Sequence, residues 1–205
     1  MACYIFGAGD PTPLHRRPAA GDYVIAADGG WTACRAAGLT PDLLLGDFDS
    51  LTAVPDFARI ERVPVEKDDT DMMLAVKRGL ALGQREFHLY GGMGGRRTDH
   101  TIANLQTLLY LAQRGAQGWL YGAGEVYTAI HGGAVTFPGR ESGILSVFCL
   151  GADAEGVTIR GAQYEVENAV LTADFPLGVS NHFVGREVTV SVERGSLLLG
   201  LRDEE

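Results

Sequence analysis

Lysine, cysteine and long apolar runs are scarce in this sequence of 205 residues. Only two residues are lysine, and acidic side chains outnumber basic ones by 26 to 17, which gives a net charge of −9. Proteins that bind nucleic acid through its phosphates are normally basic, so we expect no nucleic-acid partner. No stretch reaches the roughly 18 consecutive apolar residues of a membrane-spanning helix, and the first residues lack the basic lead of a secretory signal. We therefore expect neither a membrane partner nor export.

The three cysteines are an odd number and lie far apart in the chain, at Cys3, Cys34 and Cys149. Their spacing fits neither a disulfide framework nor a zinc site. They are best interpreted as buried thiols in a reducing compartment, which predicts a cytoplasmic protein.

What the chain does contain is typical of a folded protein rich in loops. Hydrophobic residues make up 46% and charged residues 21%, and there are 28 glycines. This is enough apolar material for a core, and the length fits one large domain or two small ones.

Short apolar runs alternate with helical patterns in the first 122 residues. Runs of this length are typical of strands buried on both faces of a parallel sheet. The expected strands are Cys3–Phe6, Tyr23–Ala27, Leu43–Leu45, Phe87–Tyr90 and Trp119–Tyr121. The expected helices are Trp31–Ala37, Met72–Leu82 and Ile102–Gln113, the last with Ile102, Leu105, Leu109 and Ala112 on one apolar face. The alternation predicts an N-terminal α/β domain with a mostly parallel sheet.

After Gly124 the helical pattern disappears. The expected strands there are 126–130, 135–137, 145–150, 157–160, 169–173, 188–193 and 197–201. Short strands separated by turn residues indicate an antiparallel β-sandwich or barrel. We therefore expect two domains, residues 1–122 and residues 123–205, the second a C-terminal antiparallel β-sandwich. A single mixed domain is the alternative.

Aspartates gather where the strands and helices of the first domain are expected to meet. They are Asp28, Asp47, Asp49, Asp68, Asp69, Asp71 and Asp99. In open α/β sheets, ligands bind outside the carboxyl ends of the strands, so four segments can bring carboxylates to one edge. Taken singly, each aspartate is explained by a turn or a helix cap. Together they repel one another unless a cation compensates them, and an all-oxygen set is typical of Mg²⁺.

A glycine-rich segment, Gly91–Gly95, is followed at once by Arg96 and Arg97. Glycines let backbone amides approach an anion closely, although an ordinary flexible turn has the same composition. Lys67 lies beside the acidic residues, where it serves either as an ion-pair partner or as a phosphate ligand. Of the five histidines only His100, directly after Asp99, is a candidate for the site.

These motifs together resemble the thiamine pyrophosphokinase family over nearly the whole chain. The matching segments are Ala27–Gly30, Pro41–Ser50, Lys67–Asp71, Gly94–Asn104, Leu145–Phe148, Gly156–Gly161, Glu167–Asn168 and Pro176–Asn181. The resemblance implies an α/β catalytic domain followed by a thiamine-binding and dimerising β-sandwich. It implies the reaction of thiamine with ATP to give thiamine diphosphate and AMP, with Mg²⁺, in a homodimer whose sites are shared between subunits.

The resemblance also implies roles for particular residues. Asp47, Asp49 and Asp71 are expected to be catalytic and to hold the metal, and Asp99 is a further catalytic candidate. The residues expected to bind ATP and its phosphates are Asp28, Lys67, Asp68, Arg97 and His100. Ser180 and Asn181, in a segment expected to be a loop, are expected to contact the thiamine pyrimidine. A cationic substrate suits the second domain, where residues 123–205 hold 12 acidic and 5 basic side chains.

Some alternatives stay open at this point. The family loop often has one arginine where this chain has Arg96 and Arg97, so either can fill that role. Asp71 and Asp99 are both candidates for the general base. A pyrophosphokinase acting on a pterin would use a similar acidic edge with a different second domain. A non-catalytic sensor of thiamine or nucleotide would be expected to have lost some of the aspartates.

Overall fold

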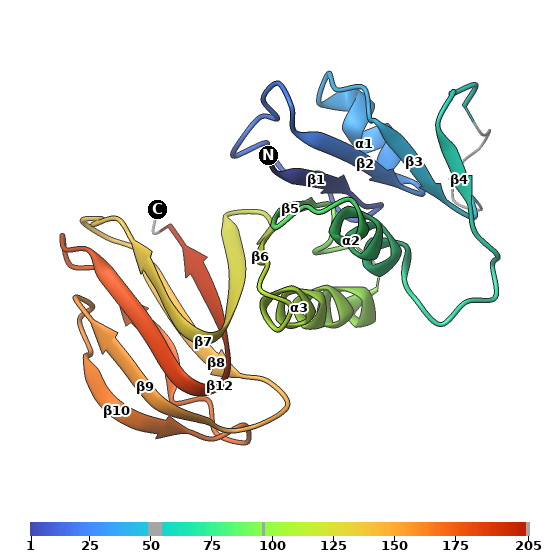
Figure 1. Cartoon of the computed structure of the whole chain (residues 1–205). Helices are drawn as coiled ribbons and strands as arrows, with labels where there is room; N and C mark the ends of the chain where they lie inside the picture. Colours follow the sequence, from blue (N-terminus) through green and yellow to red (C-terminus); the bar gives the residue numbers. More distant parts are fainter. Residues whose placement is uncertain (49–54, 96, 204–205) are drawn as a thin grey trace. The chain divides into compact units, whose positions relative to one another are not determined.

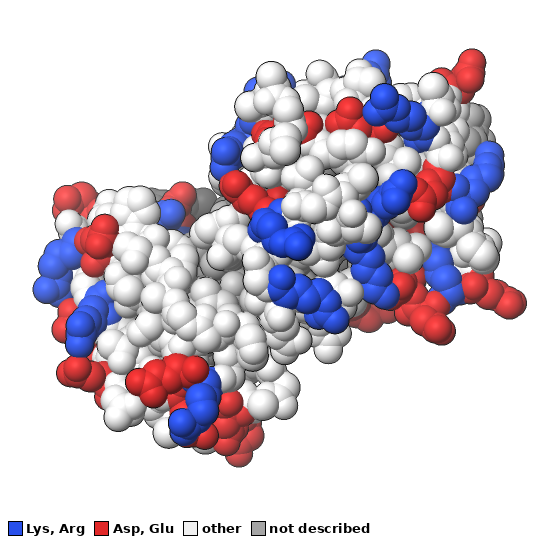
Figure 2. All heavy atoms as spheres, viewed as in Figure 1, with Lys and Arg blue, Asp and Glu red and all other residues white. Residues whose placement is uncertain are grey.

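The computed structural model describes residues 1–48, 55–95 and 97–203 (Figure 1). These residues form an α/β protein with a large sheet and three helices within the described ranges. The chain divides into two compact units, one of Met1–Thr107 with Leu120–Ala123 and one of Leu108–Trp119 with Gly124–Glu205. None of the helices described is long and apolar enough to span a membrane. On the face shown in Figure 2, basic side chains are interspersed with acidic ones.

The first unit is built on parallel strands. The strands are β1 (Cys3–Phe6), β2 (Tyr23–Ala27), β3 (Leu43–Gly46), β4 (Ile60–Arg62), β5 (Glu86–Tyr90) and the end of β6 (Gln117–Tyr121). Their order is β6-β5-β1-β2-β3-β4, and β1 pairs in parallel with β2 and β5, as β3 does with β2 and β4. The predicted strands of this unit are confirmed. Only the short β4 was not expected, because its three residues include two charged ones.

Two helices of the first unit contact the sheet, α1 (Gly30–Ala36) and α2 (Asp71–Ala81), and they lie on opposite faces (Figure 1). Glycine allows both helices to approach closely. A Cβ at Gly30 would lie 1.8 Å from the carbonyl oxygen of Phe6, and one at Gly79 would lie 2.6 Å from the ring of Phe87. Any larger residue at either position would push its helix away from the sheet.

The buried face of α3 (Thr98–Ala112) differs from the prediction. Ile102 is 55% exposed, and the fully or nearly fully buried residues are Asn104, Thr107, Leu108 and Leu111. The apolar spacing pointed to the wrong face because two of the buried side chains are polar. Both have partners inside the protein, since Asn104 donates to the carbonyl oxygen of Gly92 and Thr107 to that of Ala103.

The second unit is antiparallel throughout its described pairings. Its strands are β7 (Glu125–Phe137), β8 (Ile144–Cys149), β9 (Ala154–Arg160), β10 (Val166–Leu171), β11 (Gly178–His182) and β12 (Val188–Arg202). The long β12 pairs with β7 along its length, with β9 over its first part and with β8 over its second. The prediction divided each of β7 and β12 into two strands. The pairing of these strands has a register shift between Val192 and Ser196, and the glycines and charged residues near this shift resemble a turn in the sequence.

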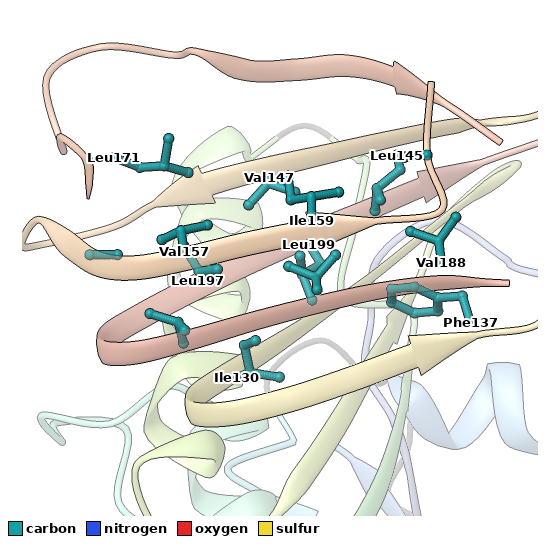
Figure 3. Packing of buried hydrophobic residues seen from close by; sticks show 14 of the residues in the cluster. Ile130, Phe137, Leu145, Val147, Val157, Ile159, Leu171, Val188, Leu197 and Leu199 are labelled. Carbon is teal, nitrogen blue, oxygen red and sulfur yellow. The ribbon is translucent and has the colours of Figure 1, made fainter. Parts of the chain in front are cut away.

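Aliphatic side chains from these strands form one core (Figure 3). Leu145 and Val147 of β8, Val157 of β9 and Leu199 of β12 are almost completely buried. They come from alternate positions, so each strand presents one face to this core, as the period of two requires.

Candidate active site

A cavity of about 390 Å³, here called the acidic cavity, lies where four parallel strands of the first unit end. Gly7 follows β1, Asp28 follows β2, Asp47 follows β3 and Gly91 follows β5, and all four residues line the cavity. The start of α2 completes this side of the wall with Asp71. The carboxyl edge of the sheet is thus the place where the sequence predicted a site.

Three carboxylates meet in this cavity. One oxygen from each of Asp28, Asp47 and Asp71 lies within 4.8 Å of the others. Asp28 is 6% exposed and adopts a left-handed backbone conformation with φ of 48°, which aspartate tolerates better than most residues. The adjacent Gly46 makes room for it, because a Cβ there would lie 3.0 Å from the Asp28 Cα atom.

Lys67 places a fixed positive charge among these carboxylates. Its Nζ lies 2.7 Å from Oδ2 of Asp47 and 3.0 Å from Oδ1 of Asp71, and its side chain is 15% exposed. Burial alone would lower the pKa of Lys67, but hydrogen bonds to the two carboxylates raise that pKa above its ordinary value. Lys67 therefore stays charged and balances part of the negative charge.

The donor set suits a hard divalent cation. Three carboxylates of different segments offer oxygen ligands only, which is the chemistry that Mg²⁺ prefers. Asp28, expected among the ATP-binding residues, lies with Asp47 and Asp71 in this group. Asp49, the other expected metal ligand, lies outside the described residues.

Gly7, Gly9, Gly91 and Gly92 form another part of the lining of the acidic cavity, here called the glycine wall. Gly9 donates a 2.7 Å backbone hydrogen bond to Gly91, and a Cβ at Gly9 would lie 2.6 Å from the Gly91 carbonyl oxygen. Asn104 holds the next residue of this wall, because its Nδ2 donates a 2.6 Å hydrogen bond to the carbonyl oxygen of Gly92. The wall is therefore thin and anchored, and a ligand can approach its backbone closely.

Of the remaining predicted ATP-binding residues, Arg97 and His100 line the acidic cavity, whereas Asp68 is exposed and is not one of its lining residues. Asp99 does not line the cavity either. It accepts a 2.5 Å hydrogen bond from Arg97, and both side chains are about two-thirds exposed. That hydrogen bond lowers the pKa of Asp99, so its carboxylate is a weaker base than an ordinary aspartate. Arg96 lies outside the described residues.

Ser180 and Asn181 belong to the second unit and lie on β11, so the expectation of a loop is wrong at these residues. This strand pairs with β8, and the register of the pairing shifts between Gly178 and Asn181. A strand with such an irregularity can contain the residues that are typical of turns, which is why the sequence suggested a loop. Ser180 is exposed with φ of 61°. Asn181 is buried, and its amide bonds both the N–H and the carbonyl oxygen of Tyr164, at 2.9 and 2.7 Å.

Sequence reasoning assigned no ligand-binding role to several residues of the acidic cavity. Thr70 lines it and caps α2, accepting a hydrogen bond from the backbone of Met73. Gly7 and Gly9 line it although they lack the spacing of a dinucleotide-binding fingerprint. Asn104 could have been found from the sequence, since it lies within a motif of the family resemblance. Its role in holding Gly92 could not, because that role depends on a hydrogen bond to a residue twelve positions earlier.

Two family models match this chain. Residues 16–120 match the catalytic domain of thiamin pyrophosphokinase, and residues 135–197 match its vitamin B1 binding domain. Bacillus subtilis thiamine pyrophosphokinase is 27% identical over 183 residues, which cover 85% of each chain.

Solved structures show the same fold. The Bacillus subtilis thiamine pyrophosphokinase structure has a TM-score of 0.89 at 23% identity and covers all of both chains. The Geobacillus thermodenitrificans structure has a TM-score of 0.85 at 25% identity and covers 100% of this chain and 99% of its own. The Candida albicans structure, at 13% identity, has a TM-score of 0.74 and covers 99% of this chain and 89% of its own. With a family model matching more than half of its residues, the chain belongs to the thiamin pyrophosphokinase family.

Proposed function

We propose that this chain transfers a pyrophosphoryl group from ATP to the hydroxyl of thiamine, giving thiamine diphosphate and AMP, in the acidic cavity. The observation that carries the proposal is the meeting of Asp28, Asp47 and Asp71 around Lys67, in a chain of this family. The thiamine oxygen forms a bond to the β-phosphorus of ATP, and the bond from that phosphorus to the α-phosphate oxygen breaks. Such transfer depends chiefly on positioning and on neutralising charge.

The three clustered carboxylates, with Asp49, are the residues proposed to hold Mg²⁺. When bound, Mg²⁺ neutralises polyphosphate charge and fixes its orientation. Arg97 and His100 line the same cavity and would face the phosphates, beside the backbone of the glycine wall. Of the two candidates for the general base, Asp71 lines the cavity, whereas Asp99 is paired with Arg97 and has a lowered pKa. Asp71 also pairs with Lys67, so its position in the cavity is what makes it the better placed of the two to accept the hydroxyl proton.

The arrangement of domains is part of the proposal. Residues 1–122 would form the catalytic domain with its mostly parallel sheet, and residues 123–205 an antiparallel β-sandwich that binds thiamine and dimerises. The parallel pairings of the first unit, the antiparallel pairings of the second and the two matched family ranges support this division. Sedimentation should then give a homodimer, and a fully active 21.9 kDa monomer would contradict it.

Thiamine recognition is proposed at Ser180 and Asn181, in a site shared between subunits. Both residues lie within the range that matches the vitamin B1 binding domain. Ser180 is exposed, so its hydroxyl can serve a ligand, and Asn181 would act by fixing the strand beneath it. A cytoplasmic location is supported by three buried free cysteines. The excess of acidic over basic side chains, 26 to 17, supports the absence of a nucleic-acid partner.

The proposal is tested by incubating the protein with thiamine, ATP and Mg²⁺ and separating the products by chromatography. Thiamine diphosphate and AMP should form in equal amounts. Asp47→Asn and Asp71→Asn should each lose at least about 10²-fold in turnover, because the charge that organises the phosphates is reduced. Asp69→Asn is the matched control, since Asp69 lies two residues from Asp71 and pairs with Lys77 instead.

Circular dichroism must show that the variants are folded. Equal losses in Asp69→Asn and Asp71→Asn would show that the loss of activity is not specific to the acidic cavity. Near-normal activity in the folded fraction of Asp47→Asn and Asp71→Asn would show that these carboxylates serve the fold alone. Either result would contradict the proposal.

A further inference from the structure

Residues 10–17, here called the strap, follow the glycine wall in the chain and lie outside the helices and strands of the first unit. The strap lines a cavity of about 670 Å³, here called the second cavity, whose other side is α1. Gly7, Gly9 and Gly91 line both the second cavity and the acidic cavity. A movement of the strap would therefore change the glycine wall as well.

The end of the strap is held by weak hydrogen bonds and by an ion pair. The backbone N–H of Arg16 donates to the hydroxyl of Tyr90, and the hydroxyl of Tyr4 donates to the carbonyl oxygen of Arg17, both at 3.4 Å. These separations exceed the usual range, so both hydrogen bonds are weak. The guanidinium of Arg16, in contrast, lies 2.7 Å from Oε1 of Glu86 on β5. This ion pair is the stronger attachment of the strap.

His88 contacts the same carboxylate oxygen. Its Nε2 lies 3.1 Å from Oε1 of Glu86, and its Nδ1 lies 2.8 Å from the hydroxyl of Tyr121. An ionised carboxylate can only accept hydrogen bonds, so Nε2 of the neutral ring carries the proton and Nδ1 accepts the proton of Tyr121. A second proton would make His88 a cation beside the oxygen that holds Arg16.

The charges of His88 and Arg16 oppose each other at this oxygen. Burial lowers the pKa of His88 below its ordinary value, the hydrogen bond and the charge of Glu86 raise it, and the charge of Arg16 lowers it. Coupling between two sites is reciprocal. Because Arg16 disfavours the second proton on His88, that proton disfavours the contact of Arg16 with Glu86. The ion pair of the strap is therefore strongest while His88 is neutral.

Further titratable groups lie around His88. Tyr4 of β1 stacks on its ring with 4.6 Å between centroids, and Tyr121 of β6 contributes its hydroxyl. The negative charge of Asp22, before β2, raises the pKa of His88. Burial raises the pKa of both tyrosines, so they stay neutral while His88 titrates.

We propose that His88 is a positioning residue that holds the strap in place while its ring is neutral and releases the strap when the ring takes up a second proton. The neutral ring donates from Nε2 to Glu86 and leaves that carboxylate to hold Arg16. The second proton comes from solvent and binds Nδ1, so the Tyr121 hydroxyl changes from donor to acceptor. The consequence for catalysis rests on the proposed function. Release of the strap should loosen the glycine wall and raise the KM for ATP.

The test uses NMR on the protein without ligands, from pH ~7.5 to ~4.5, a range that includes the ordinary histidine pKa of about 6.5. The ring ¹⁵N shifts of His88 report its tautomer and its titration, and ¹⁵N relaxation of the backbone amides reports the order of the strap. At the upper pH the ring should carry its proton on Nε2, and the order parameters of the strap should be about 0.85. They should fall below about 0.6 with the same midpoint at which His88 titrates. Residues 38–42, in another loop of the first unit, are the internal control.

Three variants separate His88 from other causes of a pH response. His88→Gln keeps a donor for Glu86 and an acceptor for Tyr121 but takes up no proton, so its strap should stay ordered at every pH. Glu86→Gln removes the charge that holds Arg16, so its strap should be mobile at every pH. His15→Gln is the matched control, because His15 is an exposed histidine of the strap whose ring stacks on Tyr121. It should respond to pH as the unaltered protein does.

Several results would overturn the inference. They are a strap that stays ordered after His88 is protonated, a neutral ring with its proton on Nδ1, and a His88 that stays neutral until the protein unfolds. A pH response that is lost in His15→Gln and kept in His88→Gln would assign the effect to the wrong histidine. Circular dichroism must show that each variant is folded. If His88→Gln does not fold, the unaltered protein and His15→Gln decide the question.

Failure of the proposed function is separable, because these measurements need no substrate. If the unaltered protein makes no thiamine diphosphate, the function is wrong, and the NMR result still decides the inference. If it makes the product and the strap does not respond to His88, the inference alone is wrong. If both hold, the KM for ATP should rise severalfold as His88 titrates, and less in His88→Gln. An equal rise in both proteins would contradict the consequence for catalysis.

Discussion

The ammonium nitrogen of Lys67 lies 2.7 Å from Oδ2 of Asp47, twenty residues earlier in the chain. The same nitrogen lies 3.0 Å from Asp71, at the start of α2. Lys67 thereby links the end of β3 to the start of α2. It also supplies the positive charge that three adjacent carboxylates need when no metal is bound.

Replacing Lys67 with methionine should destabilise the protein in the absence of Mg²⁺ by about 1–3 kcal/mol, because hydrogen bonds to charged groups contribute in this range. Added Mg²⁺ should raise the melting temperature of Lys67→Met by more than it raises that of the unaltered protein, since the cation replaces the lost charge. Lys77→Met, at an exposed ion pair with Asp69, is the control. Equal responses to Mg²⁺ in both variants would contradict this account.

Asn104 should matter for the nucleotide and not for thiamine. Asn104→Ala removes the hydrogen bond to Gly92 and leaves a buried carbonyl oxygen without this partner, at a cost of about 1–3 kcal/mol. The glycine wall should then loosen and the KM for ATP should rise severalfold. Gln106→Ala, on the exposed side of the same helix, should change neither KM. A rise in the KM for thiamine alone would contradict the placement of this wall beside the phosphates.

His88 should make stability depend on pH. The residue is 2% exposed, with Nδ1 2.8 Å from the Tyr121 hydroxyl and Nε2 3.1 Å from Glu86, whose carboxylate pairs with Arg16. Its ring also stacks on Tyr4. Burial lowers the pKa of His88 below its ordinary value, although Glu86 opposes this shift. The unfolded chain therefore takes up a proton at a higher pH than the folded protein does.

Stability should accordingly fall as the pH drops from ~7.5 to ~5.5, through the ordinary pKa of about 6.5 and toward the lower folded value. His88→Gln should show a smaller fall in melting temperature over this interval. His131→Gln, at an exposed histidine of the second unit, is the control. An equal fall in His88→Gln and the unaltered protein would contradict the role of this histidine.

Ser180 and Asn181 should separate binding from stability. Ser180→Ala should raise the KM for thiamine by roughly 5- to 150-fold, as the loss of a hydrogen bond worth about 1–3 kcal/mol predicts, and should leave melting unchanged. Asn181→Ala should also lower the melting temperature, because the buried amide bonds the backbone of Tyr164 twice. In both variants the KM for ATP should change little. If Ser180→Ala binds thiamine normally, its hydroxyl serves only the strand.

The sequence allowed much of the fold to be predicted, because buried parallel strands are continuous apolar runs. It also placed Asp47 and Asp71 in one site, since both follow from the rule that ligands bind at the carboxyl ends of strands. It also brought Asp28 to this edge, but as an ATP-binding residue and not as a member of the carboxylate cluster. It could not show that Asp99 would pair with Arg97, because that contact depends on backbone angles and side-chain directions.

The other differences have similar physical causes. Asn104 and Thr107 are buried because each finds a hydrogen-bond partner, so apolar spacing alone misjudged the buried face of α3. The second cavity, of about 670 Å³, lies between residues 10–17 and α1, which are separated in the chain by β2, and no local pattern indicates that these two segments meet.

The central claim is that the whole pyrophosphoryl group moves in one step. ATP labelled with ³²P at the β-position and ATP labelled at the γ-position are each incubated with thiamine, Mg²⁺ and the protein, and the labelled products are separated. The account predicts that both labels appear in thiamine diphosphate and that unlabelled AMP forms in equal amount. Label from the γ-position alone in thiamine monophosphate, with β-labelled ADP as the other product, would contradict it.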